Sequence, residues 1–121
     1  MGREYTAHAA FIEGVYYART GSKEKAMNAF NTCIANDLNY TEAYMEKGFL
    51  YYDDKKISEA LQVFQTLVKV KNTYADGYYW SAKCYEALNN KTEAIAYYQK
   101  SLVLDPKLKE AGEALKRLER K

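Results

Sequence analysis

A period of 34 residues is the feature that most constrains how this chain can fold. Four sequence columns keep that period through three blocks without insertion or deletion: Tyr17, Tyr51 and Tyr85; Gly14, Gly48 and Ala82; Ala26, Ala60 and Ala94; and Phe30, Phe64 and Tyr98. Such a period is typical of stacked structural units, none of which can bury its apolar face alone. We therefore expect residues 1–121 to form a single domain, with repeats at residues 7–40, 41–74 and 75–108 and a remainder at 109–121.

Each block contains two stretches of about 14 residues in which apolar residues recur three and four positions apart, the spacing of one helix face. In the second block these stretches hold Ala43, Tyr44, Gly48, Tyr51 and Tyr52, and then Ala60, Leu61, Phe64, Leu67 and Val68. Short polar turns separate the stretches at residues 20–22, 53–56 and 89–90. The sequence therefore predicts an all-α fold of antiparallel helix pairs.

The last 13 residues predict a seventh, capping helix. Its apolar residues fall on one face while charges occupy the rest: Ala111, Ala114, Leu115 and Leu118. An end repeat needs such a cover, because its apolar face cannot remain in water. No matching segment precedes the first repeat, so we expect that end either to continue into further sequence or to self-associate through Phe11, Ile12 and Tyr16.

The repeated columns resemble the tetratricopeptide repeat family. The third block carries its pattern most fully, in Tyr78, Ala82, Tyr85, Ala94, Tyr98, Ser101 and Pro106. Glu13, Lys47 and Ser81 depart from it, since many family members carry Leu there. The resemblance implies a right-handed superhelical stack in which the first helix of each pair lines a concave groove.

The implied groove is apolar and aromatic along its middle, and its candidate binding residues are Phe11, Val15, Met45, Phe49, Tyr52, Tyr79, Trp80 and Lys83. Exposed apolar strips with polar rims mark interaction sites, and Trp and Tyr are enriched among binding hot spots. We expect a non-catalytic module that binds a peptide or helix of a partner protein. The alternative is that these aromatics are core, in a structural or self-associating segment of a larger solenoid or assembly.

Some family members bind the C-terminal carboxylate of chaperones through Lys, Asn and Arg side chains on the groove helices. Phe11, Val15, Glu46, Asp76 and Trp80 occupy the matching positions in this chain. Two carboxylates among them would repel another carboxylate. We therefore expect an apolar-anchored ligand and not a chaperone C-terminus.

Other classes of function find little support in the sequence. The one histidine, His8, and the two cysteines, Cys33 and Cys84, form no catalytic or metal-ligand spacing, and no phosphate-binding glycine loop occurs, so we expect no enzyme activity, cofactor or metal. A net charge of +2 without a basic track gives no basis for nucleic-acid binding. No apolar run suits a signal peptide or a membrane span, so we expect a soluble, by default cytoplasmic protein, unless this is a fragment of an exported one.

Overall fold

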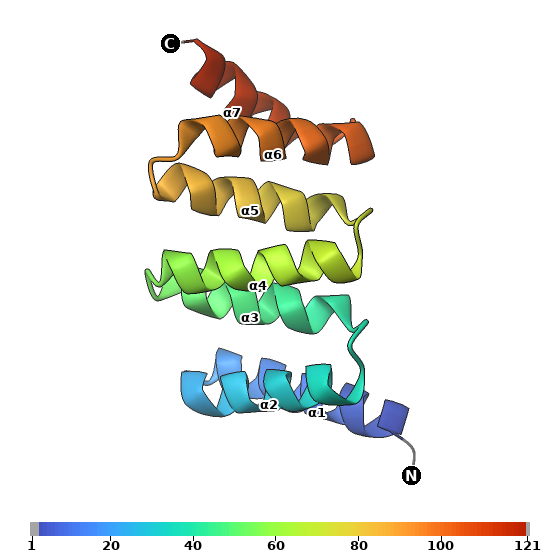
Figure 1. Ribbon diagram of the computed structural model, residues 1–121. Coiled ribbons are helices and arrows are strands. Elements are labelled where there is room, and N and C mark those ends of the chain that lie inside the picture. Colours follow the sequence, from blue (N-terminus) through green and yellow to red (C-terminus); the bar gives the residue numbers. More distant parts are fainter. Residues whose placement is uncertain (1–2, 121) are drawn as a thin grey trace.

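The computed structural model describes residues 3–120, with side chains from position 6 onward, and that part holds seven α-helices and no strand. The helices are α1 Arg3–Arg19, α2 Lys23–Asn36, α3 Thr41–Asp53, α4 Ile57–Val70, α5 Ala75–Ala87, α6 Lys91–Leu104 and α7 Lys109–Glu119. Figure 1 shows three helix pairs stacked in chain order, with α7 lying on α6 at the C-terminal end. The all-α stack of seven helices predicted from the period is confirmed.

The turn inside each pair is the same structure repeated at the 34-residue step. Its central residue has a left-handed backbone conformation at Gly21, Lys55 and Asn89, with φ of 84°, 64° and 61°. The next residue donates its backbone N–H to the carbonyl of Tyr17, Tyr51 or Tyr85, at 2.8, 2.9 and 2.9 Å. This six-residue closure is a Schellman motif, which ends a helix by satisfying its last carbonyls. The predicted polar turns thus return the chain antiparallel in all three repeats.

A ring on the second helix and a small residue on the first hold each pair together. Phe30, Phe64 and Tyr98 are fully buried. A Cβ added to Gly14 or Gly48 would lie within 3.0 Å of three atoms of the Phe30 or Phe64 ring, respectively. The ring therefore sits directly on the glycine backbone. Because interiors are close-packed, this contact fixes how near the two helices approach.

The third repeat uses a different version of this contact, and it also holds the capping helix. Ala82 replaces the glycine, and the Tyr98 hydroxyl donates a hydrogen bond to Glu86 Oε1 at 2.8 Å. Arg117 of α7 forms an ion pair with the same carboxylate and donates from Nη2 to Oε1 at 3.2 Å. The hydrogen bonds from Arg117 hold the pKa of Glu86 below its usual range. One carboxylate thus joins α5, α6 and α7.

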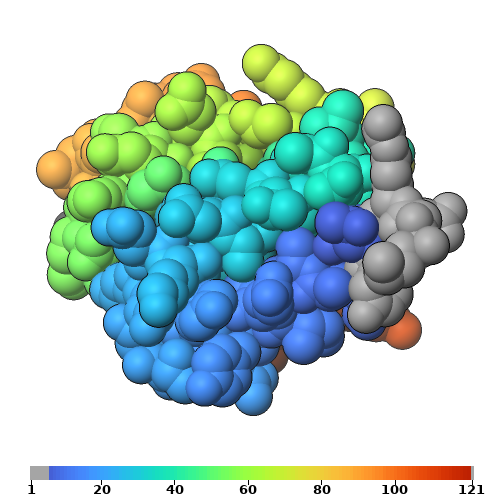
Figure 2. Space-filling view, turned by 90° about the horizontal axis from the view of Figure 1, so that it is seen from below, coloured from blue at the N-terminus to red at the C-terminus, as the bar shows by residue number. Residues whose placement is uncertain are grey.

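The N-terminal end of the stack is open. Figure 2 views that end and shows α1 and α2 forming its surface. Ile12 and Tyr16 of α1 are 54% and 63% exposed. At the equivalent positions two repeats later, Trp80 stacks on Phe64 of α4 and Cys84 is buried in the same cluster. Within the described chain, no preceding second helix covers the outer face of α1.

The glycine contact predicts opposite outcomes for two Gly→Ala substitutions. Gly48→Ala should lower the free energy of unfolding by about 1–3 kcal/mol, because its methyl group overlaps the Phe64 ring. Gly112→Ala in α7 meets nothing within 4 Å and should raise that free energy by about 0.5–1 kcal/mol through lower backbone entropy in the unfolded chain. Urea denaturation of both variants beside the wild type measures the difference. Equal effects of the two substitutions would contradict this account of the packing.

The ionisation of Glu86 should make part of the free energy of unfolding depend on pH. Because the folded-state pKa is lowered, ionised Glu86 stabilises the fold above its unfolded pKa, and this contribution is lost as pH falls through the folded value. The difference in unfolding free energy between wild type and Glu86→Gln should therefore be largest near neutral pH and shrink from roughly pH 5 to pH 3. Urea titrations at several pH values measure it. A difference that stays constant or grows on acidification would rule out this role.

Candidate functional site

Four aromatic side chains meet where α3 faces α5, with Trp80 at the centre. The ring centroid of Trp80 lies 4.9 Å from Phe49, 5.5 Å from Tyr52 and 5.6 Å from Tyr79, each in an edge-to-face arrangement. Such geometry is favourable because the positive edge of one ring meets the negative face of another. All four side chains are half-buried. We call these four rings the aromatic cluster.

Helical spacing explains why these residues meet. Phe49 and Tyr52 stand three apart on α3, and Trp80 and Lys83 stand three apart on α5, so each pair shares a helix face. Lys83 Nζ lies 5.9 Å from the Trp80 ring centroid, within the range of a cation–π contact. The cluster therefore carries one cation on an otherwise apolar surface.

Two hollows adjoin the aromatic cluster on the side of α7. One has a volume of about 350 Å³ and is lined by Tyr79, Lys83, Tyr98, Glu110, Glu113, Ala114 and Arg117. The other has a volume of about 300 Å³ and is lined by Tyr52, Lys83, Glu86, Ala87 and Arg117. Both volumes reach the lower end of the range for ligand pockets. Lys83 and Arg117 line both hollows, so together with the cluster these form one continuous candidate site.

The structure separates the eight candidate residues into three groups. Phe49, Tyr52, Tyr79, Trp80 and Lys83 come together in the site just described. Met45 is 8% exposed and lies in the central core beneath them, so it offers little surface to a ligand. Phe11 and Val15 pack against the N-terminal core instead, where the Phe11 ring lies 5.1 Å from Tyr40 and 5.9 Å from Phe30.

The tyrosines of the site are neutral hydrogen-bond donors at physiological pH. Burial, followed by Cys84, Glu86 and Asp53, raises the pKa of Tyr52. Burial and the charge of Glu110 are the largest causes of the raised pKa of Tyr79. Since an unperturbed tyrosine titrates near pH 10, both hydroxyls keep their protons. A ligand would meet aromatic faces with polar tips and no phenolate charge.

The positions that match the chaperone-binding clamp hold packing residues and acids. Phe11 and Trp80 are engaged with neighbouring rings. Glu46 is half-buried, and burial raises the pKa of its carboxyl although Arg19 opposes the change. Asp76 is exposed. None of these side chains is the Lys, Asn or Arg that such a clamp uses.

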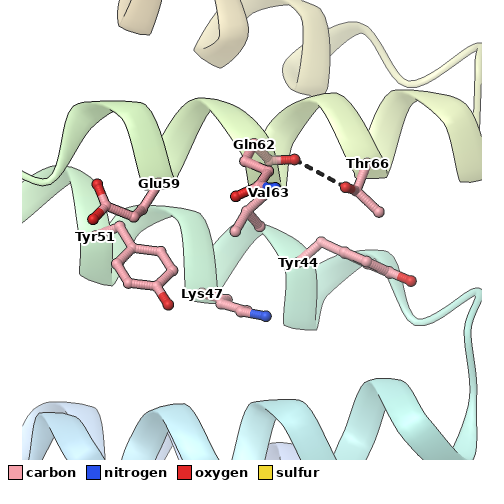
Figure 3. Close-up of a pocket in the computed structure, with 7 residues that line it drawn as sticks. All are labelled: Tyr44, Lys47, Tyr51, Glu59, Gln62, Val63 and Thr66. Atoms are coloured by element: carbon pink, nitrogen blue, oxygen red, sulfur yellow. Dashed lines mark hydrogen bonds between the residues drawn. The ribbon is translucent and has the colours of Figure 1, made fainter.

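A separate hollow of about 220 Å³, which was not predicted from the sequence, lies between α3 and α4. Figure 3 shows its lining: Tyr44, Lys47, Tyr51, Glu59, Gln62, Val63 and Thr66. Burial lowers the pKa of Lys47, the residue that departs from the family's Leu. The Thr66 hydroxyl donates to the Gln62 carbonyl at 2.9 Å and is thus already engaged. This hollow is smaller than ordinary ligand pockets and lacks the aromatic cluster.

The cysteines show no sign of reactivity. Both thiols are buried, and burial raises the pKa of Cys33 to about 11 and that of Cys84 to about 12. Reactive thiols instead have a lowered pKa and access to solvent. Among the residues the structure describes, no three His, Cys, Asp or Glu side chains are grouped to hold a metal ion. In the same part of the chain, no helix has the length and hydropathy needed to cross a membrane.

Comparison with known proteins identifies relatives at the level of sequence. Tetratricopeptide repeat profiles match residues 7–40 and 75–108. The chain is 33% identical over 85 residues to an inactive peptidyl-prolyl cis-trans isomerase, shutdown, of Bombyx mori, and 27% identical over 112 residues to tetratricopeptide repeat protein 14 of Mus musculus. These alignments cover 69% and 87% of this chain, but only 20% and 15% of the two relatives.

Solved structures share the fold at lower sequence identity. The N-terminal domain of stress-induced protein-1 from C. elegans has a TM-score of 0.90 at 21% identity, with 98% of both chains covered. The first tetratricopeptide repeat domain of Spaghetti (RPAP3) was solved with an HSP90 peptide. It has a TM-score of 0.87 at 20% identity, and the match covers 97% of this chain and 93% of that one. The period, the helix pairs and these matches agree, and the chain belongs to the tetratricopeptide repeat family.

Proposed function

We propose that this chain is a non-catalytic interaction module that binds a peptide or helix of a partner protein at the aromatic cluster and its two hollows. The observation that carries this proposal is the position of Trp80. Its ring is half-buried among Phe49, Tyr52 and Tyr79, and hollows of about 300 and 350 Å³ open beside Tyr52 and Tyr79, respectively. Rigid, partly exposed aromatics next to pockets are typical anchors for protein ligands.

Two structural neighbours support binding of a peptide in this type of fold. The RPAP3 domain was solved with an HSP90 peptide, and the protein YrrB, with a TM-score of 0.79 at 20% identity, is described as having an unusual peptide-binding site. In this chain, apolar residues and acids stand at the clamp positions. The ligand proposed here is therefore anchored by apolar side chains and differs from a chaperone C-terminal carboxylate.

The chemistry of the described residues supports the non-catalytic part of the proposal. The Nδ1 atom of His8 lies 2.9 Å from the Tyr40 hydroxyl, so the imidazole is engaged with that tyrosine. Both thiols are protonated at neutral pH because of their raised pKa. A nucleophile needs an adjacent base or a lowered pKa, and neither cysteine has one here.

A direct test uses the single tryptophan of the chain as its reporter. The probe is a Trp-free helical peptide of about 18 residues, five turns, with Leu and Phe on one face and Gln on the other. Its addition should change the emission of Trp80 in a saturable way. Tyr52→Ala should weaken this binding at least about tenfold, as hot-spot truncation does.

Tyr97→Ala is the matched control, because Tyr97 is also half-buried but packs on Tyr78 and Tyr85, outside the cluster. It should leave peptide binding nearly unchanged. Trp80→Ala is less informative, since that ring also stacks on the core residue Phe64 at 6.1 Å and its loss would weaken the fold. No change in Trp80 emission with any peptide, or equal losses in the two tyrosine variants, would refute the proposed site.

The open face of α1 supports self-association as a second candidate function. Ile12 and Tyr16 are more than half exposed on a helix face that a preceding second helix covers in the later repeats. A second copy could cover the same face. Phe11, which was also expected to take part in self-association, instead packs against the N-terminal core.

Sedimentation at several protein concentrations tests this second function. If α1 pairs with another copy, the wild type should show a concentration-dependent dimer, and Ile12→Asp should weaken it at least about tenfold by placing a charge in an apolar contact. Val103→Asp on α6 is the control, because Val103 is 74% exposed at the other end of the stack. A wild type that remains monomeric throughout would exclude self-association.

A further inference from the structure

The binding site is acidic, although the chain as a whole carries a net charge of +2. The carboxylates around the aromatic cluster belong to Asp53, Glu86, Glu110 and Glu113, which line the hollows or act on the tyrosines. The cations there are Lys83 and Arg117. Four acids against two bases leave an excess of two negative charges at the site.

The internal pairing of these charges leaves the acids available to a ligand. Arg117 is already bound to Glu86. Lys83 lies over the Trp80 ring. In contrast, the side chains of Asp53, Glu110 and Glu113 are exposed and form no ion pair or hydrogen bond within residues 6–120. Apart from Lys83, the charges of the site that lack an ion pair are thus carboxylates.

These carboxylates stand beside the apolar surface, and they come from two helices, α3 and α7. Asp53 is the last residue of α3, next to Tyr52 of the cluster. Glu110 and Glu113 lie three apart on α7 and line the same hollow as Tyr79. A ligand that lays apolar side chains on the cluster therefore brings its flanking side chains close to these acids.

The first turns of α3 and α5, the two helices that carry the aromatic cluster, add two further acids. Asp76 and Glu42 are both exposed, and their charges contribute to the raised pKa of Tyr74, a residue that packs against the central core. Complementary charge steers association and discriminates against partners of like charge. These acids would repel an acidic ligand, whereas they would attract a basic one.

We propose that the aromatic cluster and its hollows select a basic amphipathic segment, one whose apolar side chains cover Trp80 and whose Lys or Arg side chains pair with Asp53, Glu110 and Glu113. This inference rests on the proposed function and specifies the partner's chemistry. Lys and Arg suit such a place because their apolar stems can lie along the aromatic rings while the charged ends reach the carboxylates.

The experiment compares three peptides with the same Leu and Phe face and with Gln, Lys or Glu on the polar face. Trp80 emission reports binding, at about 50 mM and about 500 mM salt, since exposed charges are screened over a Debye length of about 3–10 Å in 1 M to 0.1 M salt. At low salt the Lys peptide should bind about tenfold more tightly than the Gln peptide, through two or three exposed pairs. The Glu peptide should bind most weakly, and the differences should shrink at high salt.

A double variant localises the effect. Asp53→Asn with Glu113→Gln should remove most of the preference for Lys over Gln, measured as the ratio of the two peptide affinities. The matched control, Glu59→Gln with Glu93→Gln, removes two carboxylates from the second helices α4 and α6 and should keep the preference. Circular dichroism of both variants establishes that each is folded.

The outcomes separate this inference from the proposed function. If the Gln peptide binds but the Lys and Glu peptides bind equally well, or the Glu peptide binds better, the charge selection is wrong and the binding site stands. An equal loss of Lys preference in both double variants would also overturn the inference, because it would reflect net charge alone. If none of the three peptides changes Trp80 emission, the proposed function is wrong and the inference with it.

Discussion

The contact between a buried ring and a glycine backbone is the constraint on which this structure depends. Phe30 on Gly14 and Phe64 on Gly48 leave no room even for one methyl group. The ring contributes buried apolar surface, and the glycine, which has no side chain, lets the two helices approach closely. The contact therefore needs both residue types. In the first two repeats, the distance between the paired helices follows from this contact.

Once that contact has positioned the helices, the remaining aromatic residues have different uses. Trp80 stands at a position that holds Ile12 in the first repeat and Glu46 in the second. Its indole stacks on Phe64 and is half-buried, with Phe49, Tyr52 and Tyr79 around it. The aromatic cluster thus arises where one repeat departs from the others, on a frame that all three share.

The 34-residue period was sufficient to predict the helix pairs and the turns, and the helical spacing of apolar residues predicted the capping helix. These elements depend on local spacing and on columns that repeat. The candidate site was predicted less completely. Helix periodicity alone cannot tell a half-exposed Trp80 from a buried Met45, since both lie on first helices and the difference comes from packing between repeats. The Glu86–Arg117 ion pair joins two residues that are 31 positions apart, one in a repeat helix and one in the capping helix. No repeating column therefore indicates it.

The capping helix lies at the end of the stack and also forms one wall of the candidate site. Helix α7 packs on one side only, against α6, and its ion pair to Glu86 joins it to α5. Terminal elements with few neighbours open locally at a low free-energy cost. Because Glu110, Glu113 and Arg117 line the hollow beside Tyr79, each such opening also removes that wall. A ligand bound at the site should therefore disfavour this opening and slow amide hydrogen exchange along α7.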